Sequence, residues 1–235
     1  MPRRALVLAC VAVACCTVAG LALASPQFSS TVALTFSSQA PGSPTGLDVI
    51  ASWTDPGAPN AVPQAVTKIE FVGNPGTKFD TSALPRCRAS DEDIANRSVR
   101  ACPRSSKIGS VKGQGLIVTG NPFNTIATLF NGRREIIVIV RLVDDGRLIT
   151  YFRDDVKGGS VAVNLKIPGG VALTRFEAHV PRHYRKRHGK RRAYLRTPPS
   201  CPASGLWTTT VIFTYRDGST EQRTATTPCK AKPAG

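Results

Sequence analysis

Short stretches in which apolar and polar residues alternate dominate the chain between residues 31 and 226. A period of two is typical of strands that bury one face. The clearest case is 207–215, where Trp, Thr, Val, Phe and Tyr occupy every second position. Strands are therefore predicted over residues 31–36, 47–53, 66–72, 108–119, 125–130, 135–143, 148–152, 161–167, 172–180, 194–196, 207–215 and 220–226.

The connections between these stretches indicate how the strands are arranged. Asn-Gly at 131–132 and Asp-Gly at 145–146 and 217–218 predict two-residue hairpin turns, in which both central residues need a positive φ. The β-branched run 136–140 predicts a central strand covered on both faces, and the acidic residues from Asp91 predict one short helical turn that ends near Val99. Many short strands with such turns predict an all-β fold, an antiparallel sandwich or barrel, and we expect an antiparallel β-sandwich.

The N-terminus has the composition of an export signal. Arg3 and Arg4 precede an uncharged apolar run over 5–23, and small residues before Ser25 predict a signal peptide over 1–24 and a single β-sandwich domain over 25–235. The apolar run has nearly the ~20 residues that span a bilayer, so an uncleaved membrane anchor is one alternative. A lipoprotein signal at Cys10 or Cys15 is the other.

The cysteines agree with export. The chain has seven, and the four beyond the predicted signal are Cys87, Cys102, Cys201 and Cys229. An even number in an oxidising compartment predicts two disulfides, for which three pairings exist. We expect Cys87–Cys102 and Cys201–Cys229, because each pair closes a local loop flanked by turn residues. A zinc site is disfavoured because no two of these cysteines are two to four residues apart.

Charge is the feature that suggests a partner. The chain has a net charge of +16, and two of these charges belong to Arg3 and Arg4. Residues 182–196, which we call the basic segment, carry eight cations and no acid. Its centre, His188 to Lys190, resembles a hairpin tip. The cations, our candidate polyanion-binding residues, are Arg182, Arg185, Lys186, Arg187, Lys190, Arg191, Arg192 and Arg196.

Eight like charges repel one another, so their concentration favours an anionic partner. Outside the cytosol that partner is expected to be an anionic envelope polymer: a teichoic acid, an acidic glycan or lipid headgroups. Nucleic acid is disfavoured by the export signal, and contact with the membrane is expected only if the N-terminal segment is uncleaved. The opposing interpretation is a solvated loop with idle charge.

Several short motifs resemble those of a group of secreted actinobacterial proteins with no established activity. They are LPRC at 84–87, ACPRSSKIG at 101–109, TPPSCP at 197–202, Trp207, YRDG at 215–218 and the Pro-Cys pair at 228–229. The resemblance covers most of the chain after the signal. It implies an exported all-β protein with two local disulfides, and it transfers no catalytic residue.

Motifs for catalysis and metal binding are missing from the sequence. There is no Gly-x-Ser-x-Gly, His-Glu-x-x-His or phosphate loop, so we expect no enzyme, catalytic residue, metal or cofactor. His179, His183 and His188 lie among cations that repel a metal ion. The adjacent Asp pairs, such as Asp144/Asp145 and Asp154/Asp155, are interpreted as turn residues that cap their own backbone. A secreted hydrolase with a spatially assembled site is the alternative function.

Overall fold

The computed structural model describes residues 28–187 and 190–230. The predicted signal peptide therefore lies outside the described residues. The strands are β1 (Ser29–Phe36), β2 (Leu47–Thr54), β3 (Val66–Val72), β4 (Lys78–Phe79), β5 (Lys107–Ile117), β6 (Pro122–Asn131), β7 (Glu135–Leu142), β8 (Leu148–Lys157), β9 (Ser160–Asn164), β10 (Val171–Val180), β11 (Tyr184–Arg187), β12 (Lys190–Ala193), β13 (Leu195–Arg196), β14 (Leu206–Tyr215) and β15 (Thr220–Pro228). The helices are α1 (Asp91–Arg97) and three short 3₁₀ turns, Pro59–Ala61, Ser98–Ala101 and Arg104–Ser106.

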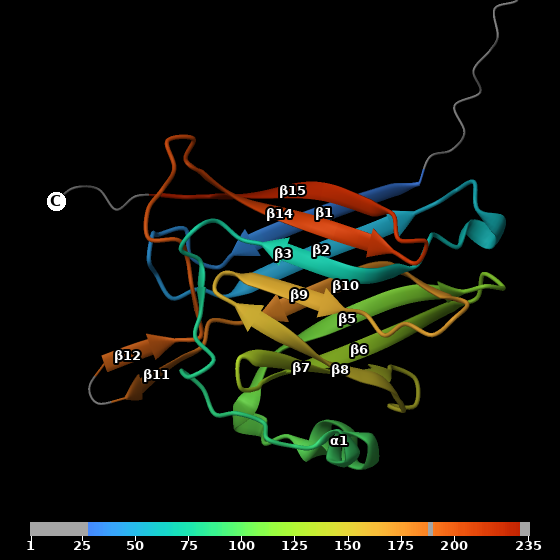
Figure 1. Cartoon of the computed structure of the whole chain (residues 1–235), viewed down its shortest axis with the longest axis horizontal. Coiled ribbons are helices and arrows are strands. Elements are labelled where there is room, and N and C mark those ends of the chain that lie inside the picture. Colours follow the sequence, from blue (N-terminus) through green and yellow to red (C-terminus); the bar gives the residue numbers. More distant parts are fainter. Residues whose placement is uncertain (1–27, 188–189, 231–235) are drawn as a thin grey trace, which may run out of the picture.

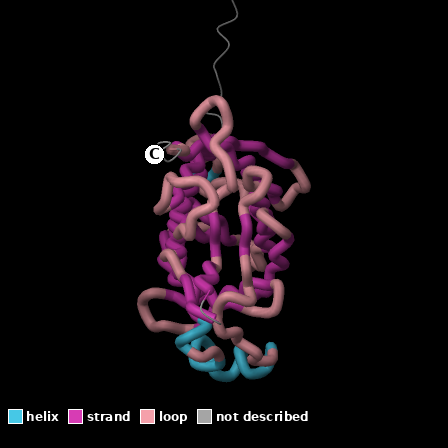
Figure 2. Tube along the Cα trace, turned by 90° about the vertical axis from the view of Figure 1, so that its left-hand side faces the viewer, coloured by secondary structure: helices cyan, strands magenta, loops and turns pink. Residues whose placement is uncertain are grey.

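The fold is all-β and antiparallel, as predicted. Eleven strands form one sheet in the order β1-β2-β10-β5-β6-β7-β8-β9-β3-β14-β15. The sheet bends back on itself, so its two halves form the two layers of the sandwich (Figures 1 and 2). The predicted face of β14 points into this core, since Trp207, Val211, Phe213 and Tyr215 are all buried.

The two edge strands, β1 and β15, lie side by side and are joined through side chains. The Thr227 hydroxyl donates to the Leu34 carbonyl oxygen at 2.8 Å. At the other end, Arg223 donates to Ser30 Oγ at 3.0 Å, and Ser30 donates to Glu221 at 2.6 Å. These bonds cover a sheet edge that would otherwise present unpaired backbone groups.

Strand β7 is covered on both faces, as its β-branched run predicts. Val138 faces the main core, whereas Ile137 and Ile139 pack with Ile94 of α1 in a second apolar cluster. The helix begins with a capping box, in which Ser90 and Asp93 each accept a hydrogen bond from the other's backbone. The short helix predicted after residue 90 is thus confirmed.

Both predicted disulfides are confirmed. Cys87 and Cys102 have Cα atoms 5.0 Å apart, and Cys201 and Cys229 have Cα atoms 5.5 Å apart. The Cys87–Cys102 disulfide belongs to the apolar cluster beside α1. The Cys201–Cys229 disulfide joins the segment before β14 to the end of β15. Two disulfides indicate an oxidising, extracytoplasmic environment.

The three predicted hairpins form, but their predicted two-residue turns are wrong. Only Gly146 and Gly218 have a positive φ at the Asp-Gly sites, and the β6–β7 turn places its positive φ at Arg134. Asn131 is instead the last residue of β6, and it is fully buried. Its side-chain amide donates to the carbonyl oxygens of Thr81, Leu84 and Pro85 at 2.9–3.2 Å, which fixes the loop beside the strand.

Candidate functional site

The basic segment forms a separate two-stranded hairpin, β11 and β12, that projects from the main sheet (Figure 1). Its register places Arg185 opposite Arg192, Lys186 opposite Arg191, and Arg187 opposite Lys190. Like charges directly opposite each other destabilise an antiparallel pair. The hairpin therefore contains three successive unfavourable pairs, which its own folding does not require.

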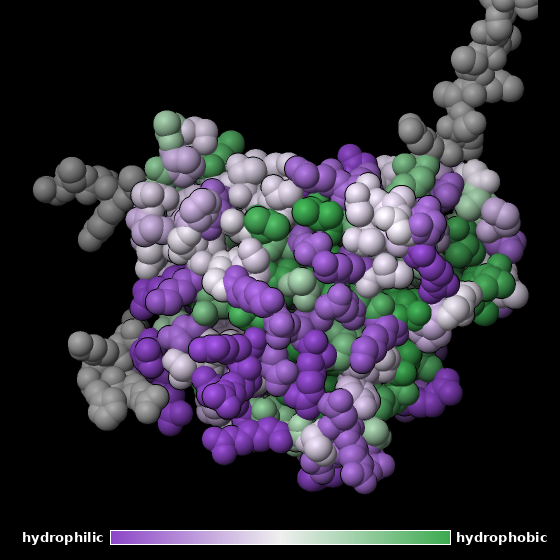
Figure 3. All heavy atoms as spheres, in the orientation of Figure 1, coloured by the Kyte–Doolittle hydropathy of each residue, from purple (hydrophilic) through white to green (hydrophobic). Residues whose placement is uncertain are grey.

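The eight candidate cations do not share one environment. Arg182, Arg185, Lys186 and Arg192 are exposed, and hydrophilic side chains gather on the face beside the hairpin (Figure 3). Arg196 lies outside the hairpin, on β13, where it is half-buried and donates to the Gly42 carbonyl oxygen at 3.0 Å. The backbone register of β11 and β12 places the remaining three, Arg187, Lys190 and Arg191, on the hairpin.

One acid of the body lies against the hairpin. The Asp80 carboxylate is 3.6 Å from the Arg192 guanidinium. Burial acts to raise the pKa of Asp80, but the hydrogen bonds from Ser82 and the charges of Arg192 and Lys78 outweigh it and leave that pKa below its usual value. Asp80 thus stays ionised and offsets part of the charge at the base of the hairpin.

The base of the hairpin is fixed to the core. His183 hydrogen-bonds the Ile108 carbonyl oxygen at 3.0 Å, and its own carbonyl accepts from the Tyr194 backbone at 3.0 Å. Tyr194 and Leu195, directly after the hairpin, are buried. The exposed cations are therefore carried on a base held by the core.

The histidines make other contacts. His179 lies 2.5 Å from Asp48, with both side chains exposed, and His183 is engaged as described above. His188 lies outside the described residues. Within 28–187 and 190–230, no group of three His, Cys, Asp or Glu residues is placed to hold a metal ion, and no helix is long and apolar enough to span a bilayer.

The Asp pairs differ in role, and one prediction about them is wrong. Asp145 accepts a hydrogen bond from the Arg147 backbone at 2.8 Å in the β7–β8 turn, as expected. Asp154 and Asp155, in contrast, lie within β8 rather than in a turn. The alternation of β8 places Asp155 outside and Asp154 inside, where Asp154 is only 1% exposed. No neighbouring glycine or proline interrupts the strand there.

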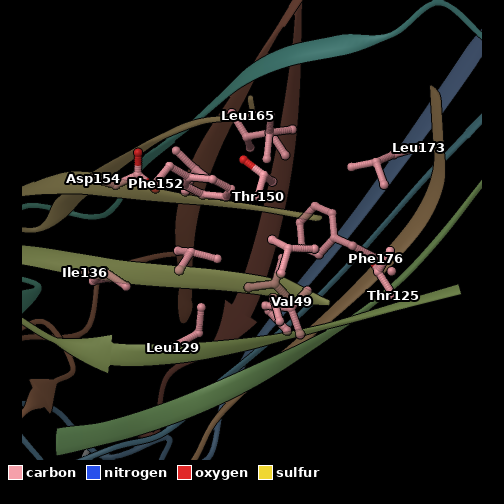
Figure 4. Close-up of a pocket in the computed structure, with 18 of the residues that line it drawn as sticks. Val49, Thr125, Leu129, Ile136, Thr150, Phe152, Asp154, Leu165, Leu173 and Phe176 are labelled. Atoms are coloured by element: carbon pink, nitrogen blue, oxygen red, sulfur yellow. The ribbon is translucent and has the colours of Figure 1, made fainter. Parts of the chain in front are cut away.

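A cavity of about 230 Å³ lies between the two layers of the sandwich. Its walls are almost entirely apolar, and the labelled side chains of Figure 4 converge on it from several strands. The wall residues include Ile136, Val140, Thr150, Asp154, Val163, Lys166, Pro168 and Tyr194. Ile136, Val140 and Val163 are only half-buried although they point inward, as expected of side chains that border a cavity rather than a packed core.

The cavity reaches the surface where β8 and β9 separate. These strands pair only through Val156 and Lys157 of β8, and beyond that point the ladder ends. The wall residues on the two sides of this gap include Thr150 of β8 and Lys166 and Pro168 of the β9–β10 connection. Lys166 and Pro168 are exposed, which places the opening beneath that connection.

Two buried polar atoms in the cavity wall, Asp154 Oδ2 and the Tyr194 hydroxyl, have no hydrogen-bond partner within residues 28–187 and 190–230. Asp154 Oδ1 accepts from the Asn164 backbone at 2.9 Å across the gap between β8 and β9. Burial raises the pKa of Asp154 to about 6, although the Asn164 hydrogen bond opposes this, and burial also raises the pKa of Tyr194. Buried polar groups without partners are uncommon and usually have a functional or structural reason.

The cavity wall contains few polar groups. Among the described residues that line it there is no histidine and no serine, and its polar groups are Asp154, Lys166, Tyr194 and two threonines. A comparison of the chain with protein-family models, curated proteins and solved structures finds no match in any of the three. The site must therefore be interpreted from its own chemistry.

Sequence reasoning identified the basic segment but missed the cavity. Inward-facing apolar residues follow the same period of two whether they pack against the opposite layer or border a cavity. The one usable signal was Asp154, because it occupies an inward position of a strand pattern that continues through Thr150 and Phe152. An acidic residue at such a position indicates a buried carboxyl group.

Proposed function

We propose that the protein is an exported binding module that docks on an anionic polymer of the cell envelope through its basic segment. Export is supported by the signal-like N-terminus, by the two disulfides, and by the resemblance to secreted actinobacterial proteins. Binding is supported by the arrangement of charge on the β11–β12 hairpin.

The observation that carries the proposal is the register of the hairpin. Three consecutive cross-strand positions pair cation with cation, and Arg185 and Arg192 at the first of them are exposed. An anionic polymer laid along the hairpin would relieve this repulsion. It would also release the counterions condensed on the polymer, which favours binding at low salt.

Retention of the purified protein on immobilised teichoic acid across a salt series tests the proposal. Eight phosphate contacts correspond to a slope of log affinity against log salt of about −7. Replacing Arg185, Lys186, Arg187, Arg191 and Arg192 by Gln should reduce the slope to about −3, because three contacts remain.

A control variant separates the hairpin from general charge. Gln at five exposed cations elsewhere, namely Arg88, Arg100, Arg104, Lys112 and Arg133, gives the same net charge. That variant should keep most of the steep slope. Equal losses in both variants would mean that net charge alone drives retention, and unchanged retention in the hairpin variant would mean that its charge is idle.

A further inference from the structure

The cavity combines an apolar wall with a buried polar atom that has no partner among the described residues, and a bound ligand would satisfy both. Its wall is apolar apart from a few groups, yet one of these groups is Asp154, whose Oδ2 is buried and has no hydrogen-bond partner among the described residues. Packed cores avoid both features, since a void loses dispersion contacts and an unpaired polar atom loses its hydration. At about 230 Å³, the cavity exceeds the ~150 Å³ apolar cavity that suffices for a benzene ring.

We infer that this cavity binds the hydrocarbon chain of an uncharged, single-chain lipid whose hydroxyl group donates to Asp154. The apolar wall would contact the chain, and the gap between β8 and β9 would admit it. Asp154 lies in β8 beside that gap and is only 1% exposed, so the head group would be buried together with the hydrocarbon chain. This site is independent of the basic segment.

The chemistry of the head group follows from Asp154 and from the apolar wall of the cavity. An ionised carboxylate only accepts hydrogen bonds, so its partner must be a donor. A fatty-acid carboxylate supplies no donor and would be repelled by Asp154. A cationic amine would have to give up its hydration inside a wall that is apolar apart from a few groups. A hydroxyl group satisfies Asp154 without either cost.

Titration calorimetry with primary alcohols from hexanol to tetradecanol tests whether the cavity binds a hydrocarbon chain. Each added methylene should raise affinity about fourfold until the chain fills the cavity, after which affinity should level off. Val163→Phe should abolish binding because Val163 points into the cavity, whereas Ala162→Phe, on the opposite face of β9, should bind as the unmodified protein does. Absence of binding, affinity independent of chain length, or equal binding by both variants would overturn the inference.

The methyl ether of each alcohol tests the head group, because it keeps the oxygen and loses the donor. The unmodified protein should prefer the alcohol about tenfold, as expected for a hydrogen bond to a charged group. Asp154→Leu should lose this preference and still bind the chain. If the unmodified protein binds alcohol and ether equally, the pairing with Asp154 is wrong. Thermal unfolding of each variant, measured alongside, distinguishes a blocked cavity from a misfolded chain.

Discussion

Asp154 should make the stability of this protein depend on pH in the direction opposite to that of most carboxylates. Its pKa is about 6 in the folded chain, against 3.8 when unfolded, because burial disfavours the charged form. Between these values the folded state binds the proton more tightly, so the contribution of Asp154 to stability is greatest below pH 3.8 and falls as pH rises towards 6. A shift of about two pKa units corresponds to a loss of about 3 kcal/mol above pH 6.

The substitution Asp154→Asn isolates this effect, since an amide of the same shape stays neutral at every pH. Urea unfolding with the disulfides intact should be measured for both proteins from about pH 3.5 to about pH 7. The free energy of unfolding of the unmodified protein minus that of the variant should fall by about 3 kcal/mol over this range. Asp144→Asn, at an exposed turn position, is the control and should leave the difference flat. A flat difference for Asp154→Asn as well would refute the burial of an ionisable carboxyl group in the cavity wall.

Three further substitutions test the structure elsewhere. Asn131→Ala leaves three carbonyl oxygens, one buried and two part-buried, without their donor and should lower the free energy of unfolding in urea by about 3 kcal/mol. Replacing Cys201 and Cys229 by Ser opens a 28-residue loop and should lower the free energy of unfolding by about 4 kcal/mol. Thermal unfolding should show a lower midpoint, and reductant should no longer act through this disulfide. Arg153 joins α1 to the sheet through Asp91 at 2.8 Å and Glu135 at 2.9 Å, so Arg153→Ala should speed hydrogen exchange in α1 and leave exchange in β14 unchanged.

The sequence was sufficient for the strands because a half-buried strand records its environment in alternate residues. The strand at 207–215 was predicted from such a pattern, and its inward residues are buried as expected. Turn geometry was harder, because a dipeptide such as Asn131-Gly132 has a turn preference that tertiary contacts can override. Here three carbonyl acceptors hold Asn131 in the strand instead.

How the sheet closes could not be predicted, since it depends on pairs far apart in the chain. The contact of β1 with β15 joins residues 193 positions apart, as in the bond from Thr227 to Leu34. The gap between β8 and β9 has another origin: these consecutive strands pair only at their ends, and β9 continues along β3 instead. Nothing in the local pattern of either strand indicates where pairing stops, so the cavity opening was not foreseeable.

The cavity and the disulfides are connected through stability. A cavity of about 230 Å³ that nothing fills costs about 5.5 kcal/mol at ~24 cal/mol per Å³. Loops of 15 and 28 residues closed by disulfides contribute about 3 and about 4 kcal/mol, which offsets that cost. A β-sandwich in the oxidising environment that these bridges indicate can therefore keep a cavity open between its layers. In a reducing buffer the same chain would lose this compensation, so an occupant of the cavity should raise the thermal midpoint of the reduced protein at least as much as that of the oxidised one.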